Sequence, residues 1–194
     1  MNIHSAWRVL RAEQLPVMPW KNGGGTTQEI ARYPQDADLD HFVWRLSMAQ
    51  VGEDGAFSAF PGVDRQLLLL AGRGMRLDRD AADAIVLDRL LTPLAFAGET
   101  AIHARLLDGP CRDFNLMLRR GQARGRIDVL SAGAHALKAR QLALFCPDGE
   151  IDVSLAAGCA VTLMRHDTLL LDASDGIECR FEGGQPLLAV SIDY

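Results

Sequence analysis

The interpretation of this chain begins with one short stretch, Trp20-Lys21-Asn22-Gly23-Gly24-Gly25-Thr26-Thr27-Gln28-Glu29-Ile30. It places an aromatic ring, a cation and an amide before three consecutive glycines, and two hydroxyls, an amide and a carboxylate after them. Glycine loses more backbone entropy on folding than any other residue. A run of three is therefore expected where the chain needs a positive φ or where another group approaches the backbone closely. The β-branched residues that follow predict a strand over residues 26–30.

A phosphate-binding loop is the first alternative for glycines that lie beside a lysine and a threonine. That motif places its glycines before the lysine and starts a helix at the following hydroxyl. Here Lys21 precedes the glycines and a strand follows them, so we exclude a phosphate loop. A wide turn with a bulge, feeding a strand and binding nothing, stays open beside a ligand-binding role.

Composition and charge limit the classes of protein to which the chain can belong. Its 194 residues are 48% hydrophobic and 23% charged, which is typical of a globular protein with one core or two smaller fused cores. The net charge of -5 is opposite to the basic surface of a nucleic-acid-binding protein, so we expect no nucleic-acid partner. No apolar run reaches the roughly 18–20 residues of a membrane span, so we expect no membrane partner.

The N-terminal residues and the cysteines indicate a compartment. The first residues lack the continuous apolar core of a signal peptide, because Arg8, Arg11 and Glu13 interrupt it. The cysteines form no C-x-x-C pair and lie among apolar residues, which favours buried, reduced thiols. They are Cys111, Cys146, Cys159 and Cys179. We therefore expect a cytoplasmic protein.

Two predicted strands, over residues 42–49 and 113–118, have chemically distinct faces at the period of two. The apolar faces carry Phe42, Trp44, Leu46, Met48, Phe114, Leu116 and Leu118. The opposite faces carry Val43, Arg45, Ser47, Ala49, Asp113, Asn115 and Met117. Polar groups on such strands are costly to bury without hydrogen bonds. The opposite faces therefore suit a pocket wall, although a structural hydrogen-bond network or a solvated face stays open.

Short strands recur about every ten residues along the whole chain, which is typical of an all-β sandwich or barrel. In the first half we predict further strands over 75–77, 84–87 and 101–107, with a connection over 93–98. A second series begins near residue 141, after a connection over 119–140. A weak repeat between residues 69–77 and 154–163 favours two similar β units. We therefore divide the chain into 1–118 and 119–194, fused into one compact domain, and place the function in the first unit because the second lacks its inward polar residues.

The residues described so far, with a few further motifs, resemble the HutD/Ves family over roughly residues 5–192. The motifs are Trp20-Lys21-Asn22-Gly23-Gly24-Gly25, Thr27 with Glu29-Ile30, Trp44-Arg45 with Ser47, Asp54-Gly55 with Phe57-Ser58, Phe60-Pro61-Gly62 with Arg65, Phe96 with Gly98, and Asp113-Phe114-Asn115. The resemblance implies a mostly antiparallel, double-barrelled cupin-like fold, that is, a jelly-roll bicupin. It also implies an auxiliary or regulatory role in histidine utilisation.

Metal-binding cupins use a cluster of histidines and a carboxylate. The five histidines here are His4, His41, His103, His135 and His166, and no two lie at ligand spacing. We therefore predict no metal and no other cofactor. His103 alternates with apolar neighbours on a predicted strand, which favours a histidine in or near the core.

The first functional hypothesis is a protein that binds a small anionic metabolite in the first unit. The predicted ligand-binding residues are Lys21, Asn22, Thr27, Glu29, Arg45, Ser47, Arg65, Asp113 and Asn115. An arginine in a half-buried site suits bidentate binding of a carboxylate. The family context suggests urocanate or a formylated or formimino glutamate as the partner, and a homodimer stays open.

Two further hypotheses stay open. One is a metal-free enzyme, such as an isomerase or lyase, with Glu29 or Asp113 as general base and Lys21 or Arg45 as electrophile. The other is a structural scaffold whose polar cluster only braces the fold. Three outcomes distinguish the hypotheses. An enzyme shows turnover, a binding protein shows saturable binding without product, and a scaffold shows no response to any ligand.

Overall fold

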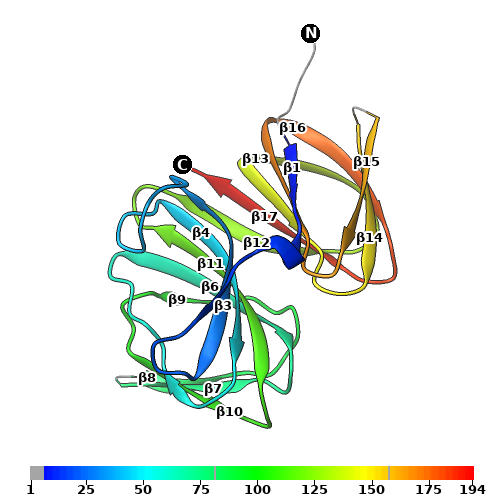
Figure 1. Ribbon diagram of the computed structural model, residues 1–194. Helices are drawn as coiled ribbons and strands as arrows, with labels where there is room; N and C mark the ends of the chain where they lie inside the picture. The colour runs from blue at the N-terminus through cyan, green and yellow to red at the C-terminus, as the bar shows by residue number, and fades with distance from the viewer. Residues whose placement is uncertain (1–6, 81, 157) are drawn as a thin grey trace. The chain divides into compact units, whose positions relative to one another are not determined.

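The computed structural model describes residues 7–80, 82–156 and 158–194. Within them, every pairing between strands is antiparallel, and the helical content is one short 3-10 turn, Ala12–Gln14 (Figure 1). The prediction of an all-β, antiparallel protein is therefore confirmed. Among the described residues, no helix is long and apolar enough to cross a membrane.

The chain divides into two compact units, and the division differs from the predicted one. One unit is Pro16–Ala123, and the other joins the segment up to Leu15 to Arg124–Tyr194. The N-terminal strand β1 (Trp7–Leu10) belongs to the second unit because it pairs with β16 (Thr168–Glu182), next to which it lies in Figure 1. The assignment of the N-terminal residues to the first unit is therefore wrong.

Two predicted connections are also strands. Residues 119–140, predicted as a link, contain β12 (Arg124–Leu130) and the beginning of β13 (Gly133–Phe145). The predicted connection over 93–98 contains β9 (Leu94–Ala97), which pairs with β6 (Val63–Ala71). Both segments alternate small or charged residues with apolar ones, and backbone pairing with a neighbour overrides their weak strand propensity.

The unit Pro16–Ala123 contains two antiparallel sheets. In spatial order, the larger sheet consists of β2 (Val17–Pro19), β3 (Gly25–Tyr33), β4 (Trp44–Val51), β11 (Cys111–Arg119), β6 and β9. The smaller sheet consists of β5 (Gly55–Ala56), β10 (Ile102–Leu106), β7 (Met75–Arg79) and β8 (Ala82–Leu87).

The two sheets share one hydrophobic cluster. The larger sheet contributes Val51, Leu67, Leu69 and Cys111, and the smaller contributes Met75, Leu77, Leu87, Ile102 and Ala104. Each fully buried leucine or methionine of this size stabilises the fold by about 1.5–3 kcal/mol. The cluster lies on the same face of the larger sheet as Asp113 and Asn115, because Leu69 and Leu67 pair directly with them.

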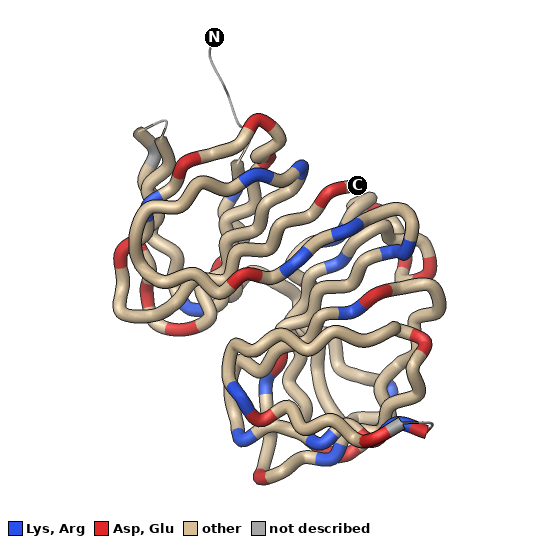
Figure 2. The backbone as a smooth tube through the Cα atoms, turned by 180° about the vertical axis from the view of Figure 1, so that it is seen from behind, with Lys and Arg blue, Asp and Glu red and all other residues tan. Residues whose placement is uncertain are grey.

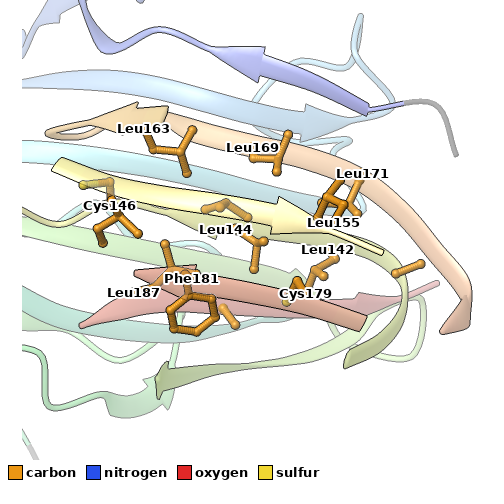
Figure 3. Close-up of a cluster of buried hydrophobic side chains, with 14 residues drawn as sticks. Leu142, Leu144, Cys146, Leu155, Leu163, Leu169, Leu171, Cys179, Phe181 and Leu187 are labelled. Atoms are coloured by element: carbon orange, nitrogen blue, oxygen red, sulfur yellow. The ribbon is translucent and has the colours of Figure 1, made fainter. Parts of the chain in front are cut away.

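The second unit is one seven-stranded sheet. In spatial order it consists of β12, β17 (Leu187–Asp193), β13, β16, β14 (Glu150–Leu155) and β15 (Cys159–Met164), with β1 beside β16. Its hydrophobic cluster consists of aliphatic, aromatic and thiol side chains, and Figure 3 shows Leu142, Leu144, Leu169 and Phe181 clustered together there. Among its described residues the unit also buries four polar ones, His166, Asp167, Thr168 and Ser191, so the expectation that it lacks inward polar residues is wrong, although none of the four lines the cavity described below.

Lys and Arg (blue) and Asp and Glu (red) occur along the described backbone of both units (Figure 2). His103 is one polar residue whose predicted place is wrong, since it is exposed on β10, opposite Asp78. The thiols of Cys111, Cys146 and Cys179 are free and buried as expected, while the side chain of Cys159 lies outside the described residues, as does His4.

Candidate ligand-binding site

A cavity of about 660 Å³ lies within the unit Pro16–Ala123, against the larger sheet. All nine residues predicted from the sequence line it: Lys21, Asn22, Thr27, Glu29, Arg45, Ser47, Arg65, Asp113 and Asn115. Lys21 and Asn22 are exposed, whereas Arg45, Ser47, Arg65, Asp113 and Asn115 are each at most 6% exposed. The structure therefore brings the predicted residues together around one space.

The alternation of β4 and β11 places their polar residues on the cavity side. Ser47 of β4 lies directly opposite Asn115 of β11, and Met117 lies between Arg45 and Arg65 of the flanking strands. Directly paired residues of antiparallel strands point to the same face of the sheet. The predicted inward faces of these two strands are thus confirmed by their register and by the lining of the cavity.

A β-bulge in β3 adds Arg32 to the cavity lining, and the sequence alone does not indicate this bulge. Glu29 pairs with Ser47, but Ala31 pairs with Leu46, so Ile30 has no partner of its own. Positions 29 and 32 would point to opposite faces of a regular strand, and the extra residue puts both on the cavity face. Arg32 consequently lies opposite Arg45 and lines the cavity.

Glu29 is shared between two arginines on this wall. Arg45 Nε donates to Glu29 Oε2 at 2.6 Å, and Arg32 Nε lies 3.2 Å from Glu29 Oε1. Arg45 Nη1 also donates to Ser47 Oγ at 3.3 Å. Buried charges need such partners, because an unpaired one loses its hydration without compensation. Glu29 is thus the carboxylate that pairs with Arg45.

The glycine-rich stretch forms a closed turn at the edge of the cavity. The turn is closed by the backbone hydrogen bonds Trp20 N–H to Gly25 O and Gly23 N–H to Trp20 O, at 2.9 and 3.0 Å. Gly23 has a φ of +77°, and a Cβ on Gly25 would lie 2.4 Å from the Gln50 carbonyl oxygen. Both reasons given for the glycines, positive φ and close approach, therefore apply, as does the predicted turn before a strand.

Side chains of this turn and of β3 hold one another in place. The Trp20 indole N–H donates to Thr27 Oγ1 at 2.7 Å, and the Gly24 N–H donates to Asn22 Oδ1 at 3.1 Å. Trp20 also packs against the hydrophobic cluster shared by the two sheets. Thr27 and Asn22 thus have structural roles in addition to lining the cavity.

Arg65 is held by aromatic rings and not by a carboxylate. Its Cζ lies 5.5, 5.7 and 5.0 Å from the ring centroids of Phe57, Phe60 and Phe96. Its Nη1 donates to the Ser58 carbonyl at 3.5 Å, and its buried Nε has no hydrogen-bond partner among the described residues. Burial lowers the pKa of Arg65 to about 10, with Asp113 raising it and Arg45 lowering it, so the guanidinium stays charged at neutral pH.

Two neighbours on β11 complete the inner wall. Burial raises the pKa of Asp113 to about 7, against the opposing influence of the Arg65 charge. The Asp113 carboxyl accepts no hydrogen bond and forms no ion pair within the described residues. Asn115 Oδ1 is buried and also lacks a donor there. Burial, and then the Asp113 charge, raises the pKa of the Cys111 thiol to about 12, so this thiol stays protonated.

The cavity offers charge and hydrogen bonds but no metal-ligand cluster. Among the described residues, no group of three or more His, Cys, Asp or Glu side chains could hold a metal ion. Four cationic side chains and two carboxyl groups line the space: Lys21, Arg32, Arg45 and Arg65, with Glu29 and Asp113. The lining is therefore cationic in a chain whose net charge is -5.

The sequence interpretation missed several lining residues. They are Met18, Pro19, Trp20, Arg32, Leu39, Ala56, Phe57, Ser58 and Phe60. Trp20, Phe57, Ser58 and Phe60 belong to the motifs that carry the family resemblance, which could have assigned them. Arg32 had no comparable indication, because its direction depends on the bulge at Ile30.

Comparison with solved structures supports the cupin-like description of the fold. A cupin 2 conserved barrel domain protein from Leptotrichia buccalis superposes with a TM-score of 0.57 at 10% identity, covering 99% of this chain and 98% of that one. At this identity the likeness concerns the fold alone. The protein is thus an all-β, antiparallel protein with cupin-like neighbours.

Closer relatives share both sequence and structure with the chain. An uncharacterised 21.2 kDa protein in the hutC 3' region of Pseudomonas putida is 38% identical over 88% of this chain and 90% of its own. A conserved protein of unknown function from Pseudomonas aeruginosa PAO1 superposes with a TM-score of 0.87 at 40% identity, covering 98% of this chain and 100% of that one. HutD from Pseudomonas fluorescens SBW25, in its formate condition, gives a TM-score of 0.84 at 34% identity, covering 97% and 98%.

The family assignment rests on nearly the whole chain. Protein Ves of Cronobacter sakazakii is 41% identical over 60% of this chain and 63% of its own. The HutD family model matches residues 12–189. The chain therefore belongs to the HutD family.

Proposed function

We propose that this protein binds a small metabolite that carries a carboxylate, in the cavity of the unit Pro16–Ala123. The observation that carries the proposal is the excess of cationic side chains around a space of about 660 Å³. A cavity of this volume fits a small molecule. Arginine is the residue best suited to a carboxylate, because its planar fork donates two parallel hydrogen bonds.

The sign of the charge distinguishes this site from the remaining surface. The chain as a whole is acidic, yet the cavity gathers Arg32, Arg45, Arg65 and Lys21. Cations placed near one another repel, and a guest anion lowers that repulsion. Buried positions strengthen the attraction, since the local dielectric constant is lower than that of water.

The metabolic role and the guests that we propose follow from the family. We place the protein in histidine utilisation as an auxiliary or regulatory binder with a bicupin fold, supported by the membership in HutD and by the relative in the hutC 3' region. Urocanate and the formylated or formimino glutamates are the proposed guests, and each is a small carboxylate. The free, buried thiols of Cys111, Cys146 and Cys179 support a reducing, cytoplasmic location.

A thermal-shift and calorimetric screen tests the proposal. Urocanate and N-formylglutamate are expected to raise the melting temperature, and the carboxamide analogue of each is expected to do so less. A ligand that binds only the folded state stabilises it in proportion to the logarithm of its concentration above Kd. No response to any carboxylate at millimolar concentration would contradict the proposal and favour a structural scaffold.

Asp113 favours one second candidate, a metal-free isomerase or lyase. A general base works best when its pKa is near the operating pH. Burial gives Asp113 a pKa of about 7, and its carboxyl lines the cavity. Incubation of the protein with urocanate and with N-formylglutamate, followed by chromatography, separates the two candidates. Product formation that Asp113→Asn abolishes supports the enzyme, and binding without product supports the binder.

A further inference from the structure

The two arginines on either side of β11 differ in their availability to a ligand. Arg45 has Glu29 Oε2 at 2.6 Å and Ser47 Oγ at 3.3 Å, so its charge is already compensated. Arg65 has no carboxylate oxygen within ion-pair distance among the described residues, and its Nε is buried without a partner. An anion in the cavity is therefore attracted more strongly by Arg65, whose charge has no carboxylate partner in the described part of the chain, than by Arg45.

The aromatic rings position the Arg65 guanidinium but do not neutralise its charge. Phe57, Phe60 and Phe96 surround the guanidinium at 5.0–5.7 Å. Cation–π contacts of this kind orient a guanidinium and exclude water from it, while the edge N–H groups stay available for hydrogen bonds. A donor that is already fixed loses little side-chain entropy when a ligand binds.

Asn115 lies within reach of the same ligand. It pairs with Leu67 across β11 and β6, two positions from Arg65, on the face that lines the cavity. Such diagonal neighbours are about 7–8 Å apart at the backbone, which long side chains bridge. Its Oδ1 is a buried acceptor that lacks a donor, and a ligand without N–H or O–H would leave it unsatisfied.

We propose that Arg65, and not Arg45, binds the carboxylate of the guest, and that Asn115 Oδ1 accepts a hydrogen bond from an N–H next to that carboxylate. This inference rests on the proposed function, since it assigns roles within the same cavity. It favours carboxylates with a neighbouring amide-type N–H, such as the formylated glutamates, over urocanate, and it excludes bare alkyl carboxylates as good ligands. The Arg45–Glu29–Arg32 group is then a wall that positions the guest.

A matched pair of probes tests the N–H requirement. N-acetylglycine has the amide N–H, and N-acetylsarcosine carries a methyl group in its place. Calorimetric titration of the full chain at pH 7 is expected to show about tenfold tighter binding of N-acetylglycine, the cost of one unsatisfied buried acceptor. In Asn115→Leu the preference is expected to fall below about twofold, because the acceptor is gone.

Substitution of Arg65 tests whether this residue binds the carboxylate. Arg65→Gln is expected to weaken both probes by more than about tenfold. Arg120→Gln is the matched control, because Arg120 is an exposed arginine of the same unit that pairs with Asp64 and Glu99. It is expected to bind both probes as the unchanged protein does. Melting curves of each variant check that it is folded, and the comparison of the two probes on the unchanged protein needs no variant.

The outcomes separate this inference from the proposed function. Equal binding of both probes by the unchanged protein, or unchanged affinity in Arg65→Gln, overturns the inference while carboxylate binding stands. Binding of acetate with neither probe bound overturns the inference in the same way. If acetate, urocanate and both probes all leave the protein unaffected, the proposed function fails as well.

Discussion

Arg45 Nε lies 2.6 Å from Glu29 Oε2, and this pair joins the two strands that carry most of the cavity wall. The arginine side chain is 7% exposed and the glutamate side chain is 18% exposed. Removal of one partner leaves a buried charge uncompensated, which costs more than the pair itself contributes. The pair therefore links β3 to β4 in the wall. The Glu29 charge also lowers the positive potential in the cavity.

Glu29→Gln is expected to separate stability from binding. The fold loses about 1–3 kcal/mol, because Arg45 and Arg32 lose their charged acceptor. Affinity for a carboxylate rises, since two arginines become available to it. Urea denaturation and titration with N-acetylglycine measure the two effects. A variant that is as stable as the unchanged protein would show that the pair is solvated, and lower affinity would show that Glu29 itself contacts the ligand.

Asp113 is expected to make stability depend on pH. Its pKa is about 7 in the folded protein and 3.8 as the ordinary reference, so the folded state binds the proton more tightly. Unfolding free energy is therefore highest below about pH 4, falls as pH rises toward 7, and levels off above that, by a few kcal/mol in all. Asp113→Asn removes this slope. Urea denaturation between pH 4.5 and 8 measures it, and parallel slopes for the two proteins would contradict the prediction.

The same carboxyl is expected to affect ligand binding. Asp113 shares the cavity lining with Lys21, Glu29, Arg32, Arg45 and Arg65, and of these Arg65 lowers its pKa, while the Cys111 thiol stays neutral over this range. An anion in the cavity repels ionised Asp113, so affinity for N-acetylglycine falls as pH rises through about 7. Titrations at pH 6 and 8 check this, with Asp113→Asn as the variant that loses the dependence. Equal affinity at both pH values would place the guest away from Asp113.

Gly25→Ala is expected to distort the turn that supports the cavity. The new Cβ would lie 2.4 Å from the Gln50 carbonyl oxygen and 3.0 Å from the Trp20 ring. Overpacking of this kind costs about 1–3 kcal/mol, and displacement of Trp20 breaks its hydrogen bond to Thr27. Gly184→Ala is the control, because its Cβ would enter open space. Tryptophan fluorescence and melting curves report both effects, and equal melting temperatures for the two variants would sink the idea.

Metal removal is expected to leave the protein unchanged. The described residues hold no cluster of three or more metal-ligating His, Cys, Asp or Glu side chains. Protein purified without added metal should keep its melting temperature in a chelator, because metal bound to the folded state would otherwise contribute to folding. Metal analysis that finds one tightly bound transition-metal ion per chain would contradict this.

The period-two pattern of the sequence accounts for much of the candidate site. Asp113 and Asn115 share a face with Met117, as Arg45 does with Ser47, and these strands lie side by side in the sheet. Alternation is a local property, so it can be found without knowledge of the fold. The bulge at Ile30 is different, because its position depends on how β3 pairs with β4.

The division into units could not be predicted for a similar reason. The strand β1 pairs Trp7 with Leu171, and no local pattern indicates a partner more than 160 residues away. His103 shows a further limit. Alternation places it on one face of β10, but the face that is buried is decided by the packing of Ile102 and Ala104 against the other sheet.

The unpaired residue in β3 has a consequence for how relatives of this chain can diverge. Regular pairing of the same residues, without the bulge, would put Ala31 across from Arg45 and turn Arg32 to the opposite face. One cation would leave the cavity although no residue that lines it had been substituted. The composition of the site therefore depends partly on the bulge in one strand, so that a shift in the pairing of β3 with β4, more than a point substitution, can change which anions the family accommodates.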